Sequence, residues 1–339
     1  MDEILNKKLK NVQEELKFSG TVLISDQQGV IVEQKAGFAN RSDQIRNEMN
    51  TRFGIASGCK IFTAVAICQL VQAGKLSFET NLKDCLDIEV TQFSADITIH
   101  QLLTHTSGVP DYFDEEVMDD FEELWEKTPM YLLHRLRDFL PLFQHEEMKF
   151  QPGERFHYNN AGYILLGLVI ESVSDQEYHA YVEEHIFAKA GMHDSGYFSF
   201  DALPGRTALG YIDGPDGSWR TNQYALPVRG GSDGGAFVTA GDMNRFWEAL
   251  LTNQLLSEPM TEKLLVPYAQ DEEGSWYGYG VWMEKRDETI LVYHVMGYDP
   301  GVNFRSGYYP TFGITAIVCS NGEEGAEELM DALEEYLMS

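Results

Sequence analysis

The chain has 339 residues, of which 43% are hydrophobic and 23% are charged, and this composition excludes a disordered protein. Its 25 basic and 54 acidic side chains give a formal net charge of −29. That charge excludes nucleic acid as a partner because a polyanion is repelled. The longest apolar runs, 61–71 and 163–170, are shorter than the ~18 residues of a membrane-spanning helix. A strongly solvated surface explains the acidity, with attraction for cationic substrates as the alternative.

The apolar spacing predicts helices and strands in a distinctive order along the chain. Residues 4–17 predict an amphipathic helix, and 20–25 with 30–34 predict an antiparallel hairpin. The run 61–71 predicts a buried helix that ends before Gly74. Further helices are expected over 99–103, 121–140, 160–173 and 177–190. The last quarter predicts strands over 277–284, 289–294, 302–308 and 312–319 and a helix over 324–337.

Strands at both ends with helices between them predict an α/β fold of the α+β type. We expect one antiparallel sheet, built from both chain ends and flanked by the terminal helices, with a mostly helical lobe inserted. The expected organisation is a single domain over 1–339. Within it, an α/β lobe takes about 1–60 and 270–339, and a mainly helical lobe takes about 61–269.

The cysteines and the amino terminus bear on the compartment. None of the four cysteines forms a C-x-x-C pair, which favours buried free thiols and a reducing compartment. The first residues contain no apolar core of a signal peptide. We therefore expect a cytoplasmic protein, or an extracytoplasmic one if a leader segment has been removed.

A serine and a lysine open the buried helix, at Ser57 and Lys60. Residues three apart share one helix face, so the amine can approach the hydroxyl. The first turn also leaves the Ser57 backbone N–H free to face an oxyanion. Burial would lower the pKa of Lys60 and make it a base. S-x-x-K alone is weak, and the alternative is an N-cap serine beside a surface lysine. However, Lys60 is the only charge between Arg52 and Lys75.

A second polar group precedes the apolar helix 163–170. Tyr158 could lie over the serine and relay a proton, and Asn160 could hold the lysine or a substrate amide. The structural alternative is a buried aromatic followed by an N-cap.

These motifs resemble the serine β-lactamase and penicillin-binding protein superfamily, in its class C β-lactamase-like and esterase-like branch. Ser57-x-x-Lys60 matches S-x-x-K, and Tyr158-Asn159-Asn160 matches Y-x-N. The segment 294–301 resembles the third motif, K-T-G or H-x-G followed by a Pro-Gly turn. The flanks 102–108, 234–242 and 279–280 are also similar, so the likeness runs from about residue 20 to the end.

The resemblance implies that a Lys or His on an inner strand faces the nucleophile, and His294 is the best match for it. Met296 then stands where glycine is usual, and it could crowd the cleft or shift the register by one residue. With the register kept, the backbone N–H groups of Gly297 and Ser57 form the oxyanion hole. A satisfied strand histidine is the alternative for His294.

Three further features are interpreted as structural. Residues 105–108 predict a turn behind the site, and 213–217 a surface turn. The nine acids of 111–126 predict a solvated helix, or else a segment that overhangs the cleft. The spacing of His179 and His185 with two glutamates fits no zinc pattern.

The resulting hypothesis is a serine acyl-hydrolase that forms an acyl-enzyme on Ser57. Its substrate would be a small molecule or peptide with an ester, D-amino-acid peptide or β-lactam-like carbonyl. The alternatives are a penicillin-binding protein of the DD-carboxypeptidase type, or a catalytically weak acyl-binding scaffold. No cofactor, metal, nucleic acid or membrane span is expected, and the oligomeric state is left open.

Overall fold

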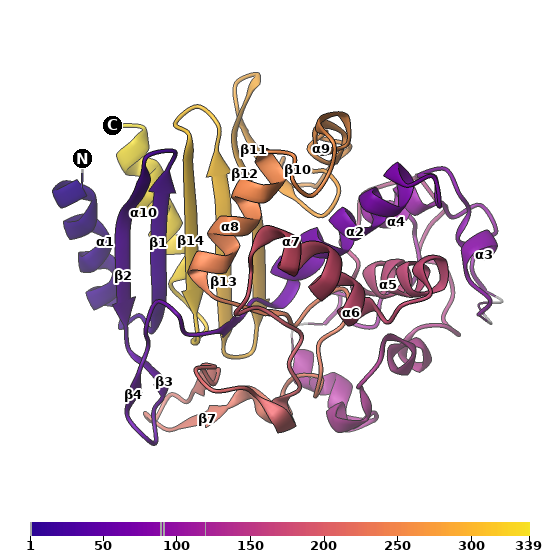
Figure 1. Ribbon diagram of the computed structural model, residues 1–339. Coiled ribbons are helices and arrows are strands. Elements are labelled where there is room, and N and C mark those ends of the chain that lie inside the picture. The colour runs from indigo at the N-terminus through magenta and orange to yellow at the C-terminus, as the bar shows by residue number, and fades with distance from the viewer. Residues whose placement is uncertain (1, 89, 91, 119) are drawn as a thin grey trace.

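The computed structural model describes residues 2–88, 90, 92–118 and 120–339. Its largest element is an antiparallel sheet of eight strands in the order β2-β1-β14-β13-β12-β11-β10-β9 (Figure 1). The strands are β1 (Gly20–Asp26), β2 (Gly29–Ala36), β9 (Ala269–Gln270), β10 (Trp276–Tyr277), β11 (Trp282–Arg286), β12 (Thr289–Asp299), β13 (Val302–Tyr309) and β14 (Ile314–Ser320). Strand β1 pairs with β14, with Val22 opposite Val318. The two chain ends therefore build one sheet, as predicted.

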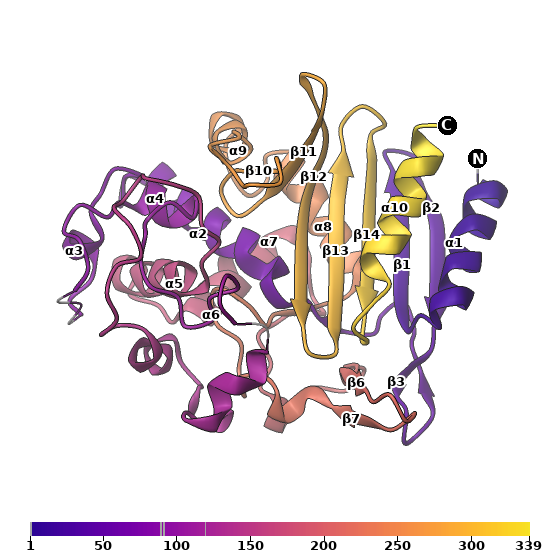
Figure 2. The same cartoon turned by 180° about the vertical axis from the view of Figure 1, so that it is seen from behind.

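Helices cover both faces of this sheet. Helices α1 (Asp2–Leu16) and α10 (Ala326–Leu337) lie together on one face (Figure 2). Helix α10 buries Ala326, Leu329, Met330 and Leu333, which recur at helical spacing and form one apolar stripe. On the other face lies α8 (Ala240–Leu251), where the Trp247 indole N–H donates to Ser306 Oγ of β13 at 2.8 Å. Helix α8 thus covers the sheet although its sequence falls within the segment assigned to the helical lobe. The division into two lobes stays a prediction.

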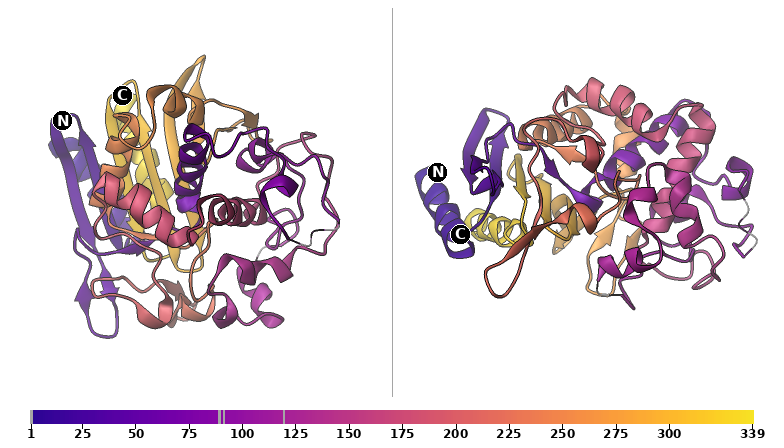
Figure 3. Two further views of the ribbon diagram at one scale, coloured as in Figure 1. Left: turned by 45° about the vertical axis from the view of Figure 1, so that its right-hand side comes forward. Right: turned by 90° about the horizontal axis from the view of Figure 1, so that it is seen from below.

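Beyond the sheet the molecule is mostly helical, with elements drawn from the middle of the chain (Figure 3). Its elements are α2 (Lys60–Gln72), α3 (Leu82–Cys85), α4 (Ile99–Leu103), α5 (Asn160–Ser174), α6 (Tyr178–Val182), the π-turn η5 (Glu183–Phe187), α7 (Ala188–Ala190) and α9 (Glu258–Leu264). Helix α2 packs against α5, and both are apolar on nearly every side. An all-round apolar helix is stable only in an interior, so this pair is the centre of the larger core.

The remaining elements are short. They are the strands β3 (Phe38–Asn40), β4 (Ile45–Arg46), β5 (Phe53–Gly54), β6 (Tyr211–Asp213), β7 (Trp219–Thr221) and β8 (Phe237–Val238), with the turns η1 (Ala56–Cys59), η2 (Phe121–Glu126), η3 (Met130–Leu132), η4 (Leu136–Leu142), η6 (Phe200–Ala202) and η7 (Asn222–Tyr224). All four cysteines are free thiols, and Cys59, Cys68 and Cys319 are buried as predicted, whereas Cys85 is partly exposed. None of the described helices is long and apolar enough to cross a membrane.

The predicted helix 121–140 is wrong. The segment forms the separate 3-10 turns η2, η3 and η4 instead. Pro129 precedes η3 and Pro141 lies inside η4, and proline cannot donate the hydrogen bond that continues a helix. The Asp138 carboxylate also accepts from the backbone N–H groups of His134 and Arg135, which competes with helical bonds.

Two strand boundaries also differ from the prediction. The predicted strand 277–284 is divided into β10 and β11 by a tight turn, in which Gly278 N donates to Val281 O at 2.9 Å. Gly280 has a φ of +71° there, a conformation that favours glycine. Strand β12 continues past the predicted end at 294 to Asp299, so it runs alongside the turn that holds Ser57.

Candidate active site

Ser57 lies in the turn η1, directly before α2, and its side chain faces a cleft. The residue before it, Ala56, has a φ of +44°, which costs a non-glycine residue about 1–3 kcal/mol. Two backbone hydrogen bonds hold this conformation, from Ile55 N to Ala236 O at 3.0 Å and from Gly235 N to Ala56 O at 3.2 Å. Among the residues that the structure describes, the Ser57 backbone N–H has no acceptor. It is therefore available to an oxyanion, as the sequence predicted.

Lys60 is the first residue of α2 and is 98% buried, with a relative exposure of 2%. Its Nζ lies 2.9 Å from Ser57 Oγ. The same nitrogen donates to Asn160 Oδ1 at 2.8 Å and to the backbone oxygen of Asp233 at 2.8 Å. The predicted contact between serine and lysine is thus present, and Lys60 is no surface residue.

Asn160 begins α5 with its side chain directed at Lys60. The N-cap is the residue before it, Asn159, whose Oδ1 accepts from Gly162 N at 2.6 Å. The Asp111 carboxylate accepts from the backbone N–H groups of Asn160 at 2.7 Å and Ala161 at 3.0 Å, at the positive end of the helix dipole. Burial nevertheless raises the pKa of Asp111 to about 7.

Tyr158 lies over the nucleophile, with its hydroxyl beside the Ser57 side chain. Lys60 Nζ is 4.8 Å from the centre of its ring. The ring stacks on Trp282, with 6.0 Å between centres, and contacts the buried imidazole of His105 at 4.5 Å. Burial and the negative charge of Glu115 raise the pKa of Tyr158 well above its usual value, so the phenol is neutral at physiological pH. His105 belongs to the predicted turn behind the site.

Gly297 is the residue of β12 that approaches the nucleophile most closely. A Cβ at this position would lie 2.1 Å from Ile55 O and 2.9 Å from Ser57 N, so no side chain fits. Side chains alternate between the two faces of a strand, so Met296 points to the opposite face. On that face Met296 is paired with Arg305 of the neighbouring strand β13, and it also lines the open cleft. The residue against the nucleophile is therefore a glycine, and the methionine lies one position before it.

The structure contradicts the placement of His294 beside the nucleophile. His294 shares the face of Met296 and is buried there, with Nε2 3.3 Å from the Glu284 carboxylate on β11. Burial lowers the pKa of His294, which keeps the imidazole neutral. The position that shares a face with Gly297, two residues before it, is Val295. The motif thus occurs with its register shifted by one residue, and no cation from β12 reaches Ser57 in the described part of the chain.

A glycine-rich loop, residues 230–236, completes the surroundings of Lys60. Its end belongs to the flank 234–242 noted in the sequence, but its contact with Lys60 was missed by sequence reasoning. The Ser232 carbonyl accepts from Thr63 Oγ1 at 2.5 Å, and the next carbonyl, of Asp233, accepts from Lys60. The Asp233 carboxyl group is buried and bonds to the Tyr112 hydroxyl. The four glycines around Asp233 in the sequence indicate a close backbone approach, but only the fold shows what the backbone approaches.

Two spaces have Ser57 among their lining residues. An open cleft of about 790 Å³ runs along β12, and its walls include Ser57, Tyr158, Trp282, Met296 and Gly297. An inner cavity of about 60 Å³ is lined by Ser57, the glycine-rich loop and several phenylalanines. Residues of the acidic segment 111–126, such as Glu115 and Glu122, line the cleft. That segment forms a cleft wall, and the predicted solvated helix is wrong; residue 119 lies outside the described residues.

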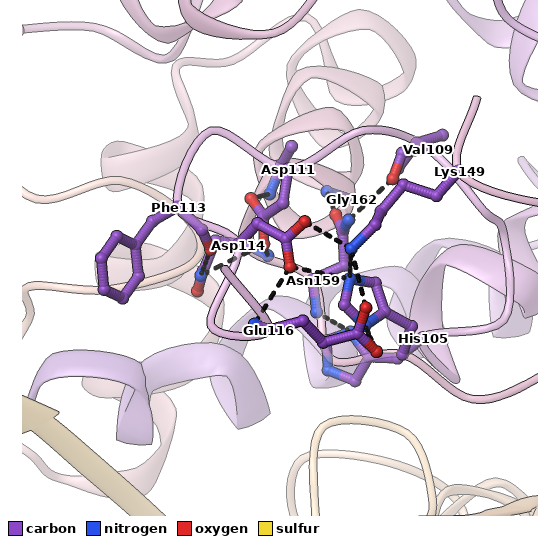
Figure 4. Close-up of polar contacts among 12 residues, drawn as sticks. His105, Val109, Asp111, Phe113, Asp114, Glu116, Lys149, Asn159 and Gly162 are labelled. Atoms are coloured by element: carbon purple, nitrogen blue, oxygen red, sulfur yellow. Dashed lines mark hydrogen bonds and ion pairs between the residues drawn. The ribbon is translucent and has the colours of Figure 1, made fainter. Parts of the chain in front are cut away.

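One group of potential metal ligands occurs near the site, formed by Asp114, Glu116 and His157. The Lys149 ammonium already lies among them: it bonds to Asp114, to Glu116 at 3.1 Å and to His157 Nε2 at 2.8 Å (Figure 4). Because a cation occupies the position that a metal would take, this group is an ion-pair cluster. It ties the acidic segment to the loop that carries Tyr158.

Comparisons with known proteins agree with this geometry. The family model described as Beta-lactamase matches residues 5–337. The crystal structure of a penicillin binding protein from Bacillus halodurans shares 59% sequence identity, covering 97% of this chain and 99% of that chain with a TM-score of 0.93. The structure of the octameric penicillin-binding protein homologue from Pyrococcus abyssi shares 25% sequence identity. The match covers 100% of this chain and 78% of that chain with a TM-score of 0.87. Penicillin-binding protein 4* of Bacillus subtilis (strain 168) is 29% identical over 331 residues, which are 93% of this chain and 70% of the relative. The chain belongs to the Beta-lactamase family, and its resemblance to penicillin-binding proteins is confirmed.

Proposed function

We propose that the protein hydrolyses acyl compounds through a covalent ester on Ser57. The observation that carries the proposal is the set of three contacts made by Lys60 Nζ. Two of its partners, Asn160 Oδ1 and Asp233 O, are carbonyl oxygens that only accept hydrogen bonds. A neutral amine has two N–H groups for these two oxygens, and its lone pair then faces the Ser57 hydroxyl. This arrangement suits a general base.

In the acylation step, Ser57 Oγ bonds to the substrate carbonyl carbon while its proton moves to Lys60 Nζ. The oxyanion is stabilised by the backbone N–H of Ser57. The backbone N–H of Gly297, expected as the second donor, is directed at β13 instead, because Gly297 and Phe304 form a hydrogen-bonded pair two residues before the closing pair of the hairpin, Asp299 and Val302. The tetrahedral intermediate then expels an alkoxide or amine, which takes the proton of the neutral Tyr158 hydroxyl. Tyr158 recovers a proton from the Lys60 ammonium, so the charges balance.

In the deacylation step, water attacks the ester carbonyl and gives up a proton to the neutral amine of Lys60. The ester bond breaks, Ser57 Oγ regains a proton, and the carboxylic acid leaves. Esters, D-amino-acid peptides and β-lactams all present a carbonyl that this sequence of steps would open.

A second candidate is a penicillin-binding protein whose acyl-enzyme clears slowly. The specific observation that favours it is that the 59%-identical structure is itself a penicillin binding protein. In that case a β-lactam would acylate Ser57 and remain attached, whereas short esters would turn over slowly.

Intact-protein mass spectrometry with a fluorescent penicillin and p-nitrophenyl acetate tests both candidates. We expect an adduct on the wild type and none on Ser57→Ala, with Ser218→Ala, an exposed serine, as the matched control. An adduct that clears within minutes supports the hydrolase, and one that persists supports the penicillin-binding candidate. If the wild type shows neither adduct nor ester turnover, the proposed function is wrong.

A further inference from the structure

Asp299 is the last residue of β12, and the reaction proposed above does not use it. It lies two residues beyond Gly297, so its side chain leaves the strand on the same face, about 7 Å further along. That face touches the Ser57 turn. Asp299 is also one of the few residues that line both the open cleft and the inner cavity. Its side chain therefore lines the same two spaces as the nucleophile Ser57.

The Asp299 carboxylate lacks a partner. Among the described residues, no side chain or backbone N–H bonds to it. The other carboxyl group of the cavity, Asp233, has the Tyr112 hydroxyl as a donor. The cost of removing Asp299 from water raises the pKa of its carboxyl group to about 7, and the negative charge of Asp233 adds to this rise. A cation entering the cavity would relieve both effects.

The open cleft is negatively charged, like the Asp299 carboxylate. Acidic residues at its walls are Glu115, Asp120, Asp271 and Glu323. The guanidinium of Arg220 also lines the cleft, but it is already bound by Glu122 at 2.5 Å. Among the described lining residues, no unpaired cation is available for a substrate carboxylate. The field of the cleft attracts cations and repels anions.

We propose that Asp299 binds a primary ammonium group on the acyl part of the substrate, close to the carbonyl that Ser57 attacks. The substrate class is then an amino-acid ester or amide, or a peptide with a free amino end. Asp299 acts as a specificity-determining residue, because an N-acylated substrate would leave its carboxylate desolvated and unpaired. Phenylalanine side chains of the cavity, Phe121 and Phe237 among them, surround the remaining space, where an ammonium also gains from aromatic faces. The inference rests on the proposed function for the identity of the reacting carbonyl.

Equilibrium binding tests the ammonium site separately from the proposed hydrolase function, because binding needs no turnover. The background is Ser57→Ala, and the probes are alanine p-nitroanilide and its N-acetyl derivative, each as D and L forms. Isothermal titration calorimetry compares Ser57→Ala alone with Ser57→Ala/Asp299→Asn and with Ser57→Ala/Asp287→Asn. Asp287 is an exposed acid in the turn between β11 and β12 and serves as the matched control.

We expect the free amine to bind at least about tenfold more tightly than the N-acetyl form, because a charged hydrogen bond in a desolvated site is strong. Asp299→Asn should lower this preference by about 10- to 100-fold, whereas Asp287→Asn should leave it unchanged. Equal binding of the two probes, or an equal effect of the two substitutions, would overturn the inference. Turnover of either probe by the wild type is measured separately, and its absence bears on the proposed function alone.

Discussion

A methyl group added to Gly297 would stand 2.9 Å from the backbone nitrogen of Ser57, so these two residues fix the spacing between β12 and the nucleophile turn. The same methyl group would meet Ile55 O at 2.1 Å, and both neighbours are backbone atoms that cannot rotate away. This close approach explains why glycine is needed at 297 and why its neighbour Met296 is tolerated.

The first prediction compares Gly297→Ala with Met296→Ala. Gly297→Ala should move β12 away from Ser57 and lower the acylation rate by about 100-fold, since a misplacement of about 1 Å has that effect. Met296→Ala should retain far more of the acylation rate, because that side chain lines the open cleft but lies on the face of β12 opposite the Ser57 turn. Stopped-flow acylation with a fluorescent penicillin or an activated ester measures both. Equal losses in the two variants would contradict the assigned register.

The second prediction concerns His294, which packs against Glu284 and away from Ser57. His294→Ala should leave the acylation rate close to that of the wild type and lower the free energy of unfolding by about 1–3 kcal/mol, because a buried contact is lost. Tyr158→Phe is the contrasting variant, with a slow acylation step and little change in stability. A stable His294→Ala protein that fails to acylate would show that the imidazole takes part in the reaction.

These two predictions show where the sequence was sufficient and where it failed. The Ser57–Lys60 contact follows from residue spacing within one helix turn, so it was predictable, and the buried helices follow from continuous apolar runs. Which side chains of β12 face Ser57 was not predictable in this way. A shift of one residue turns every side chain to the other face, and the motif alone cannot distinguish His294 from Val295 at the position facing Ser57.

Contacts between segments that lie far apart in the sequence could not be predicted either. Asp233 meets Lys60 only because the loop 230–236 returns between α2 and α5, and it does so through a backbone oxygen that carries no sequence signal. Segment 121–140 was predicted as a helix because its apolar residues suit that period. A helix does not form there because of the prolines at 129 and 141 and the hydrogen bonds of the Asp138 carboxylate to the nearby backbone.

The third prediction concerns Lys60, whose removal has two separable effects. Lys60→Met should lower the acylation rate by about 1,000-fold, a typical value for the loss of a general base. It should also lower the free energy of unfolding by about 1–3 kcal/mol, because Asn160 Oδ1 and Asp233 O lose their buried donor. Lys127→Met, at an exposed position, is the matched control and should change neither quantity. Acylation kinetics and urea unfolding measure the two effects, and an active Lys60→Met protein would contradict the role of base.

The fourth prediction follows from the raised pKa of Asp299, which is about 7 in the folded protein against 3.8 for the free side chain. Between these values the folded state binds more protons than the unfolded chain, so Asp299 lowers the stability as the pH rises from about 4 to 7. Below this window the carboxyl group is protonated in both states and contributes no difference. Asp299→Asn removes the titrating group, so the variant should be more stable than the wild type at pH 8 by about 1–3 kcal/mol and equally stable near pH 4.

Urea unfolding of the wild type, Asp299→Asn and Asp287→Asn at both pH values provides the measurement. Asp111, whose pKa is also raised to about 7, stays in all three proteins, so the difference between variants isolates Asp299. Asp287 is exposed, and its substitution should have the same small effect at both pH values. If Asp299→Asn changes the stability equally at pH 4 and pH 8, the carboxylate is well solvated. A solvated carboxylate would gain little from a cation, so this outcome would also weaken the case for an ammonium group beside Ser57.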